Sequence, residues 1–127
     1  PGGAQEPQDA GLADTAFREA HEEVGIAPAD VEVLGFLRPQ WTVSGFSMTP
    51  VIGLIEQPSP LLIDEAEVAE AFQVPAQHLY DAREHRESLR QFQGLELPVV
   101  EIEWRSRRIW GATATVIQRL NKVIKNN

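Results

Sequence analysis

The chain has 127 residues, a formal net charge of −8 at pH 7 and 24 % charged residues, which suits one domain with a hydrophobic core. It has no cysteine, which excludes disulfides, thiolate metal sites and a cysteine nucleophile. The acidic balance argues against binding to a nucleic-acid backbone. No apolar run reaches the ~18–20 residues that span a bilayer, and no signal peptide is recognisable. Neither a nucleic acid nor a membrane is therefore an expected partner.

The first half of the sequence predicts a glycine-rich loop, one helix and two strands, over residues 2–11, 12–24, 31–37 and 46–55. Gly25 follows the helix, where a left-handed cap is typical. Pro58 and Pro60 mark a linker after the second strand.

The second half predicts two short helices, two strands and a final helix, over residues 64–72, 75–80, 100–104, 108–110 and from after Gly111 to about Lys125. Residues 81–90 are highly charged and are expected at the surface. Residues 105–107 are predicted to form a hairpin tip, and Thr113 is the predicted N-cap of the last helix. The order of elements favours a mixed α/β domain over a regular βαβ series.

The helix ends in the block REAHEEVGI, residues 18–26, which carries three carboxylates on one side. At 3.6 residues per turn, Glu19, Glu22 and Glu23 fall within an arc of about 100°. Like charges at i,i+4 cost a helix about 0.2–0.5 kcal/mol, whereas Mg²⁺ prefers such oxygen ligands. The pattern indicates either a divalent-cation site or a solvated acidic face.

Together with the preceding loop PGGAQEPQDAG, this helix resembles the signature of the Nudix hydrolases. That signature is a glycine, five residues, an acid, seven residues and an R-E-apolar-x-E-E-x-G-apolar block. The matching positions are Gly3, Asp9, Arg18, Glu19, Ala20, Glu22, Glu23, Gly25 and Ile26. Two departures are visible: the upstream acid is Asp9 rather than glutamate, and eight residues separate it from Arg18.

Both departures resemble the coenzyme A diphosphatase branch of the family. The segments 33–53, 67–75 and 108–117 are similar to the same branch, so that the resemblance covers almost the whole chain. That branch usually carries a basic, glycine-containing motif just before its Pro-Gly-Gly, and this sequence opens at that tripeptide.

The fold implied by the resemblance is of the α/β (α+β) class, a Nudix-type α/β/α sandwich around a mixed sheet. Residues 1–127 are expected to form a single Nudix domain that lacks its N-terminal part and its first strands. Exposed strand edges would follow, and these invite pairing with another chain, as in a homodimer.

The resemblance also implies a site for Mg²⁺ or Mn²⁺. The expected ligands are Glu19 and Glu23, with Glu22 as a third or water-mediated contact and the backbone carbonyl of Gly3. Arg18 is expected to pair with Glu22 and hold it in place.

The base that activates water comes, in the family, from the helix or from a later glutamate. Glu67 and Glu70 are the later candidates here, and they are equally consistent with ordinary acids near a helix N-terminus. For the substrate, Trp41, Phe46 and Met48 are expected to stack adenine or line a pantetheine channel. Burial of Phe46 and Met48 in the core is the alternative.

The implied activity is metal-dependent hydrolysis of a diphosphate linkage in a small nucleotide. The first expectation is a cytoplasmic enzyme that converts coenzyme A, or an acyl-coenzyme A, to 4′-phosphopantetheine and adenosine 3′,5′-bisphosphate. The alternatives are a Nudix hydrolase of ADP-ribose or NADH-type substrates and a non-catalytic Nudix-fold module that binds a nucleotide.

Overall fold

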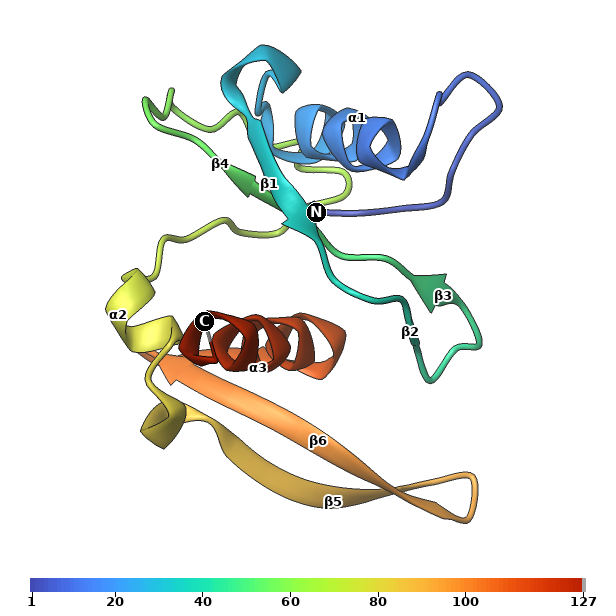
Figure 1. Ribbon diagram of the computed structural model, residues 1–127, viewed down its shortest axis with the longest axis vertical. Coiled ribbons are helices and arrows are strands. Elements are labelled where there is room, and N and C mark those ends of the chain that lie inside the picture. Colours follow the sequence, from blue (N-terminus) through green and yellow to red (C-terminus); the bar gives the residue numbers. More distant parts are fainter. Residues whose placement is uncertain (127) are drawn as a thin grey trace. The chain divides into compact units, whose positions relative to one another are not determined.

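The computed structural model describes residues 1–126, which fold as two compact units, Pro1–Phe72 and Gln73 onward. Each unit combines a long helix with strands (Figure 1). All strand pairs among the described residues are antiparallel. The expected α+β class is confirmed, but residues 1–126 do not form the mixed sheet that was also expected.

The first unit contains one long helix, a 3₁₀ turn and four short strands: α1 (Leu12–Val24), η1 (Pro28–Asp30), β1 (Glu32–Phe36), β2 (Gln40–Trp41), β3 (Ser47–Met48) and β4 (Val51–Leu54). β1 pairs with β4, with a register shift between Val33 and Gly35, and β2 pairs with β3. The helix α1 contacts β4 and η1.

Helix α1 has the bounds that the sequence predicts. It ends because Gly25 adopts a left-handed conformation with φ of 75°, which costs a glycine little. The Gly25 N–H donates to the carbonyl of His21, and Ile26 N–H donates to that of Ala20. The buried residues of the helix are Thr15 and Val24, so that the acidic side is left facing outward or toward the loop.

The second unit contains two short helical turns, three strands and a long helix: α2 (Ala76–Leu79), η2 (Ala82–Glu84), β5 (Arg86–Phe92), β6 (Leu95–Trp104), β7 (Arg107–Trp110) and α3 (Gly111–Lys125). The strands form a β5-β6-β7 meander, whose first hairpin runs past the end of α3 (Figure 1). α3 packs on β6 and β7. With 15 residues it is the longest helix, and no helix within residues 1–126 has the length and apolar character needed to cross a bilayer.

The helix predicted over residues 64–72 is wrong. These residues form a turn at Glu65–Glu67 and otherwise irregular chain. The Asp64 carboxylate accepts a hydrogen bond from Ala66 N–H at 3.0 Å. This local bond offers the backbone an alternative to the helix.

Three strand and cap predictions need correction. The strand predicted over residues 46–55 is split into β3 and β4, and the break lies at Pro50, which has no N–H to donate. α3 begins at Gly111 rather than near Thr113, with Trp110 as its N-cap. Residues 86–92 are exposed, as expected for a surface segment, but they form strand β5.

The core of the second unit supplies a stability test. Ile102 on β6 is 0 % exposed, so Ile102→Ala is expected to lower the free energy of unfolding by about 2–5 kcal/mol through lost burial and a cavity. Urea denaturation followed by circular dichroism measures the loss. Leu89→Ala is the control, because Leu89 on β5 is 64 % exposed and its loss should cost about 0.5 kcal/mol. Equal losses for both variants would contradict this placement of the core.

Candidate metal centre

Three carboxylates converge in the first unit. Glu19 and Glu23 lie one turn apart on α1, and Glu67 comes from the turn that follows Asp64. Each of the three offers one oxygen atom, and these atoms all lie within 4.8 Å of one another. The structure thus brings together two helix glutamates and one of the two later glutamates, Glu67 and Glu70, that are candidates for the base.

The neighbouring glutamates lie outside this group of three. Among the described residues the group comprises only Glu19, Glu23 and Glu67. The Glu22 side chain is 52 % exposed and accepts from Arg18 Nη1 at 3.3 Å, which is the ion pair that the sequence predicts. Glu70 is also exposed. Direct ligation by Glu22 is therefore less well supported than ligation by Glu67.

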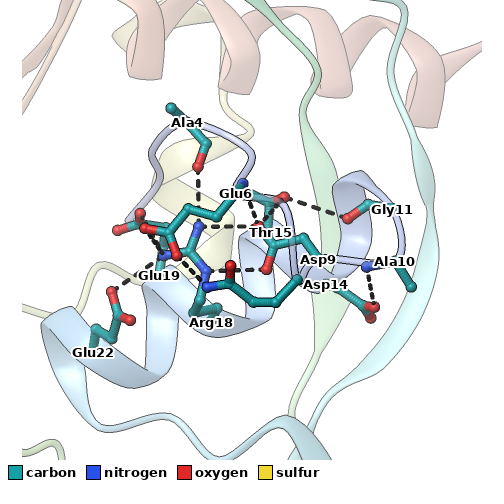
Figure 2. A network of polar contacts seen from close by, with 11 residues as sticks. Ala4, Glu6, Asp9, Ala10, Gly11, Asp14, Thr15, Arg18, Glu19 and Glu22 are labelled. Atoms are coloured by element: carbon teal, nitrogen blue, oxygen red, sulfur yellow. Dashed lines mark hydrogen bonds and ion pairs between the residues drawn. The ribbon is translucent and has the colours of Figure 1, made fainter.

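Arg18 is the centre of a polar network that joins the loop to the helix (Figure 2). Its Nε and Nη2 donate to the two carboxylate oxygens of Asp9, both at 3.1 Å. Nη1 donates to Glu19 at 3.1 Å, and Nη2 also donates to the carbonyl of Ala4 at 3.0 Å. With the bond to Glu22, these contacts occupy all five donors of a guanidinium.

Asp9 is held almost completely out of solvent, with 4 % of its side chain exposed. Hydrogen bonds from Arg18 are the main reason that the pKa of Asp9 is lowered from 3.8 to about 2, and the Glu6 N–H and Thr15 hydroxyl contribute to the lowering. The same pairing raises the pKa of Arg18. Asp9 therefore carries a charge in the folded protein and fixes the orientation of the guanidinium.

Thr15 is a contributor that the sequence analysis did not identify. It is buried, with 5 % exposed, and its Oγ1 donates to Asp9 Oδ2 at 2.9 Å. A buried hydroxyl requires a hydrogen-bond partner. By donating to Asp9, the Thr15 hydroxyl helps to hold that carboxylate in place. No residue spacing in the sequence signals this contact, because the two residues meet only once the loop folds back onto α1.

Glu23 has the opposite electrostatic environment. Burial raises the pKa of its carboxyl group, and the nearby charge of Glu19 adds to the rise. A hydrogen bond from the backbone of Gly2 partly opposes it. A carboxylate in such a place is stabilised by a cation brought close to it.

Gly3 lies against the carboxylate of Glu19. A Cβ atom built on Gly3 would be 2.5 Å from Glu19 Cδ, closer than real Cβ atoms approach other atoms. A side chain at position 3 would require the end of the Glu19 side chain to shift. Because Arg18 also binds the Ala4 carbonyl, the main chain at residues 3–4 is fixed beside the acidic group.

The expected substrate-contacting residues lie on the β2–β3 hairpin of the same unit. Trp41 is 77 % exposed and Phe46 is 70 % exposed, so Phe46 does not belong to the core. Met48 is half-buried. The hairpin therefore offers two aromatic side chains to a ligand or partner.

The Asp9–Arg18 pair gives a prediction on pH. A carboxyl whose pKa is lower in the folded than in the unfolded state stabilises the fold above its unfolded value, and the effect is lost as the pH falls toward the folded value. Asp9→Asn is therefore expected to lower the urea midpoint near pH 7. The difference from the parent protein should shrink as the pH falls from 3.8 to about 2.

Urea titrations at several pH values measure this difference. Asp30→Asn is the control, since Asp30 is an exposed aspartate in η1 and should show no comparable dependence. A constant difference between Asp9→Asn and the parent protein down to pH 2 would contradict the role assigned to the ion pair.

The chain matches a known protein family over most of its length. The family model of the NUDIX domain matches residues 1–92. The chain is 38 % identical to Nudix hydrolase NudL of Pectobacterium atrosepticum, 40 % identical to that of Yersinia enterocolitica and 39 % identical to that of Escherichia coli. Each alignment covers 94 % of this chain and 62 % of the relative, so the chain spans less than two thirds of the length of these relatives. The matched residues include the loop, α1 and the Glu67 turn, and the chain belongs to the Nudix family.

Proposed function

We propose that this protein hydrolyses a diphosphate linkage in a nucleoside diphosphate derivative, with a divalent cation held by Glu19, Glu23 and Glu67. The observation that carries the proposal is the convergence of these three carboxylates from two separate segments. In a chain of the Nudix family, such a cluster fits pyrophosphohydrolase chemistry. Without a cation, the mutual repulsion of these glutamates would destabilise the folded protein.

The donor set fits a hard divalent cation. Carboxylate oxygens are the ligands that Mg²⁺ and Mn²⁺ prefer, and the backbone of Gly3 passes close to the Glu19 carboxylate. We assign Glu19, Glu23 and Glu67 as ligands, with the Gly3 carbonyl as a further one and Glu22 as a water-mediated contact. When bound, the cation offsets the diphosphate charge and lowers the pKa of a bound water.

The chain's own residues then orient the reaction. Arg18 fixes Glu19 through its hydrogen bond at 3.1 Å and ties it to Asp9. A carboxylate has two oxygens, so Glu67 can hold the cation with one and accept the proton of the attacking water with the other. Glu67 is exposed, as a group that meets substrate water must be.

For the substrate, we propose coenzyme A or an acyl-coenzyme A. The products would be 4′-phosphopantetheine and adenosine 3′,5′-bisphosphate. Support comes from the resemblance of several segments to the coenzyme A diphosphatase branch and from the exposed rings of Trp41 and Phe46, which suit stacking on adenine. The relatives' names state no substrate, so ADP-ribose and NADH-type compounds are the competing substrates.

A non-catalytic nucleotide-binding module is the third possibility. Binding alone does not require three carboxylates within 4.8 Å of one another, and this favours an enzyme. We also propose that both units belong to one Nudix domain, because the family match extends to residue 92, beyond the unit boundary at Phe72. The homodimer and the cytoplasmic location stay predictions.

Removing either helix ligand tests the proposed chemistry. Glu19→Gln and Glu23→Gln keep the side-chain shape but lose a charged ligand. Each is expected to lower turnover by about 100-fold or more, beyond the ~10–100-fold typical of residues that only support a ligand. Release of adenosine 3′,5′-bisphosphate from coenzyme A in Mg²⁺ or Mn²⁺ measures it.

Glu65→Gln is the matched control, since Glu65 is an exposed glutamate beside the Glu67 turn and outside the acidic group. Its turnover should equal that of the parent protein. Near-normal activity of both Glu19→Gln and Glu23→Gln would show that the cation site is assigned to the wrong residues. If coenzyme A is inert while ADP-ribose or NADH is hydrolysed with release of AMP under the same conditions, only the substrate assignment is wrong.

The β2–β3 hairpin gives a separate prediction on substrate affinity. Trp41→Ala is expected to raise KM for coenzyme A by about 5–10-fold with little change in kcat, because ring stacking contributes about 1–1.5 kcal/mol in both ground and transition states. Steady-state kinetics separates the two constants. Val43→Ala, at a 68 % exposed position on the same loop, is the control, and an equal rise in KM would argue against stacking by Trp41.

A further inference from the structure

We propose that Asp64 and the backbone of Leu62–Asp64 form an anchor on the end of α1, and that this anchor positions Glu67 and thereby sets the affinity for the divalent cation. The inference rests on the proposed function, since it gives Asp64 a positioning role for a ligand of that site. It concerns a contact between segments about 40 residues apart in the sequence.

The anchor uses carbonyl groups that the helix leaves without partners. The last four C=O groups of an α-helix have no partner within the helix. Two of them accept hydrogen bonds from this segment: Leu62 N–H donates to the Val24 carbonyl at 2.9 Å, and Asp64 N–H donates to the Glu23 carbonyl at 2.9 Å. The segment is therefore docked on the same turn of α1 that carries the Glu23 carboxylate.

Gly25 makes this docking sterically possible. A Cβ atom on Gly25 would lie 2.7 Å from Leu62 Cβ and 2.9 Å from Leu62 N. Both distances are too short for a side chain at this position, and the φ of 75° already disfavours one. Gly25 thus serves the helix end and also the approach of the anchor.

Asp64 converts the docked segment into a defined turn. Its Oδ1 accepts from Ala66 N–H at 3.0 Å. Its carbonyl accepts from Glu67 N–H at 3.1 Å and from Val68 N–H at 2.8 Å. The backbone of Glu67 is therefore fixed three residues after the point where the chain is bonded to Glu23.

The surrounding chain gives Glu67 little other support. No helix or strand lies between Leu54, the end of β4, and Ala76, the start of α2, and connections of this length are usually functional or flexible. Glu67 is exposed and is repelled by Glu19 and Glu23. Holding its backbone in place reduces the ordering that a cation must impose on binding.

Mn²⁺ binding and amide hydrogen exchange of the full chain test the anchor. Asp64→Ala is expected to weaken Mn²⁺ binding by about tenfold, the lower end of the effect of residues that orient metal ligands. It should also speed exchange of the Leu62 and Asp64 amides in the metal-free protein. Asp64→Asn keeps the Oδ1 acceptor and should restore both, and Glu65→Ala is the control for loss of a nearby charge.

A second variant removes the bond to α1 directly. Leu62→Pro deletes the N–H that binds the Val24 carbonyl, at a side chain that is 74 % exposed. It should weaken Mn²⁺ binding as Asp64→Ala does while circular dichroism shows an intact fold. Unchanged Mn²⁺ affinity in both variants would overturn the inference. Equal weakening in Asp64→Ala and Asp64→Asn would also overturn it, because the charge of Asp64 would then be responsible.

Glu67→Gln separates the anchor from the proposed function. It should weaken Mn²⁺ binding while the Leu62 and Asp64 amides stay protected. If Glu19→Gln, Glu23→Gln and Glu67→Gln all bind Mn²⁺ as the parent protein does, the proposed cation site is wrong. If only Glu67→Gln binds normally, the site stands without Glu67, and the anchor has no ligand to position.

Discussion

The acidic group of the first unit depends on the hydrogen bonds of Arg18, which use all the N–H donors of its guanidinium. Its donors bind two carboxylates on α1, the Asp9 carboxylate and the Ala4 carbonyl. The loop and the helix are therefore joined through the guanidinium of Arg18, with the Thr15 hydroxyl as a second contact to Asp9. Asp9 is nearly inaccessible to solvent and has a lowered pKa. It therefore stays charged, and its ion pair with Arg18 stays intact, near neutral pH.

A second constraint acts at the other end of α1. There the carbonyls of Glu23 and Val24, which have no partner within the helix, accept hydrogen bonds from the backbone that precedes Glu67. The helix thus organises the acidic group through its side chains and its main chain. Glu23 takes part in both ways, since its carboxylate belongs to the group and its carbonyl holds Asp64.

The sequence was sufficient to predict α1, because apolar periodicity and Gly25 define both its course and its end. It also indicated Glu19 and Glu23 as a pair. The family resemblance indicated Glu67 only as a candidate base. Its place beside Glu19 and Glu23 was not predicted, since no periodicity links residues so far apart. The hydrogen bonds of Leu62 and Asp64 to the end of α1 could not be predicted, because every residue except proline has the same backbone N–H donor.

The errors have local causes. Residues 64–72 have an acidic, helix-favouring composition, but the Asp64 side chain bonds its own turn. Strand β5 was missed because its residues, Arg86–Phe92, are all exposed and lack the alternation of a half-buried strand. Its pairing with β6 is directed instead by a turn in which Gln93 and Gly94 both have positive φ, as two-residue hairpins require.

The occupied donors of Arg18 have a consequence for how an anionic ligand arrives. Residues 1–72 contain 13 acidic and two basic side chains, and Arg18 has no N–H left to offer a phosphate. Long-range forces on an approaching diphosphate are thus repulsive on this unit. Dissolved salt shortens the range of such repulsion, so the association rate of a polyanion with this unit should rise with ionic strength.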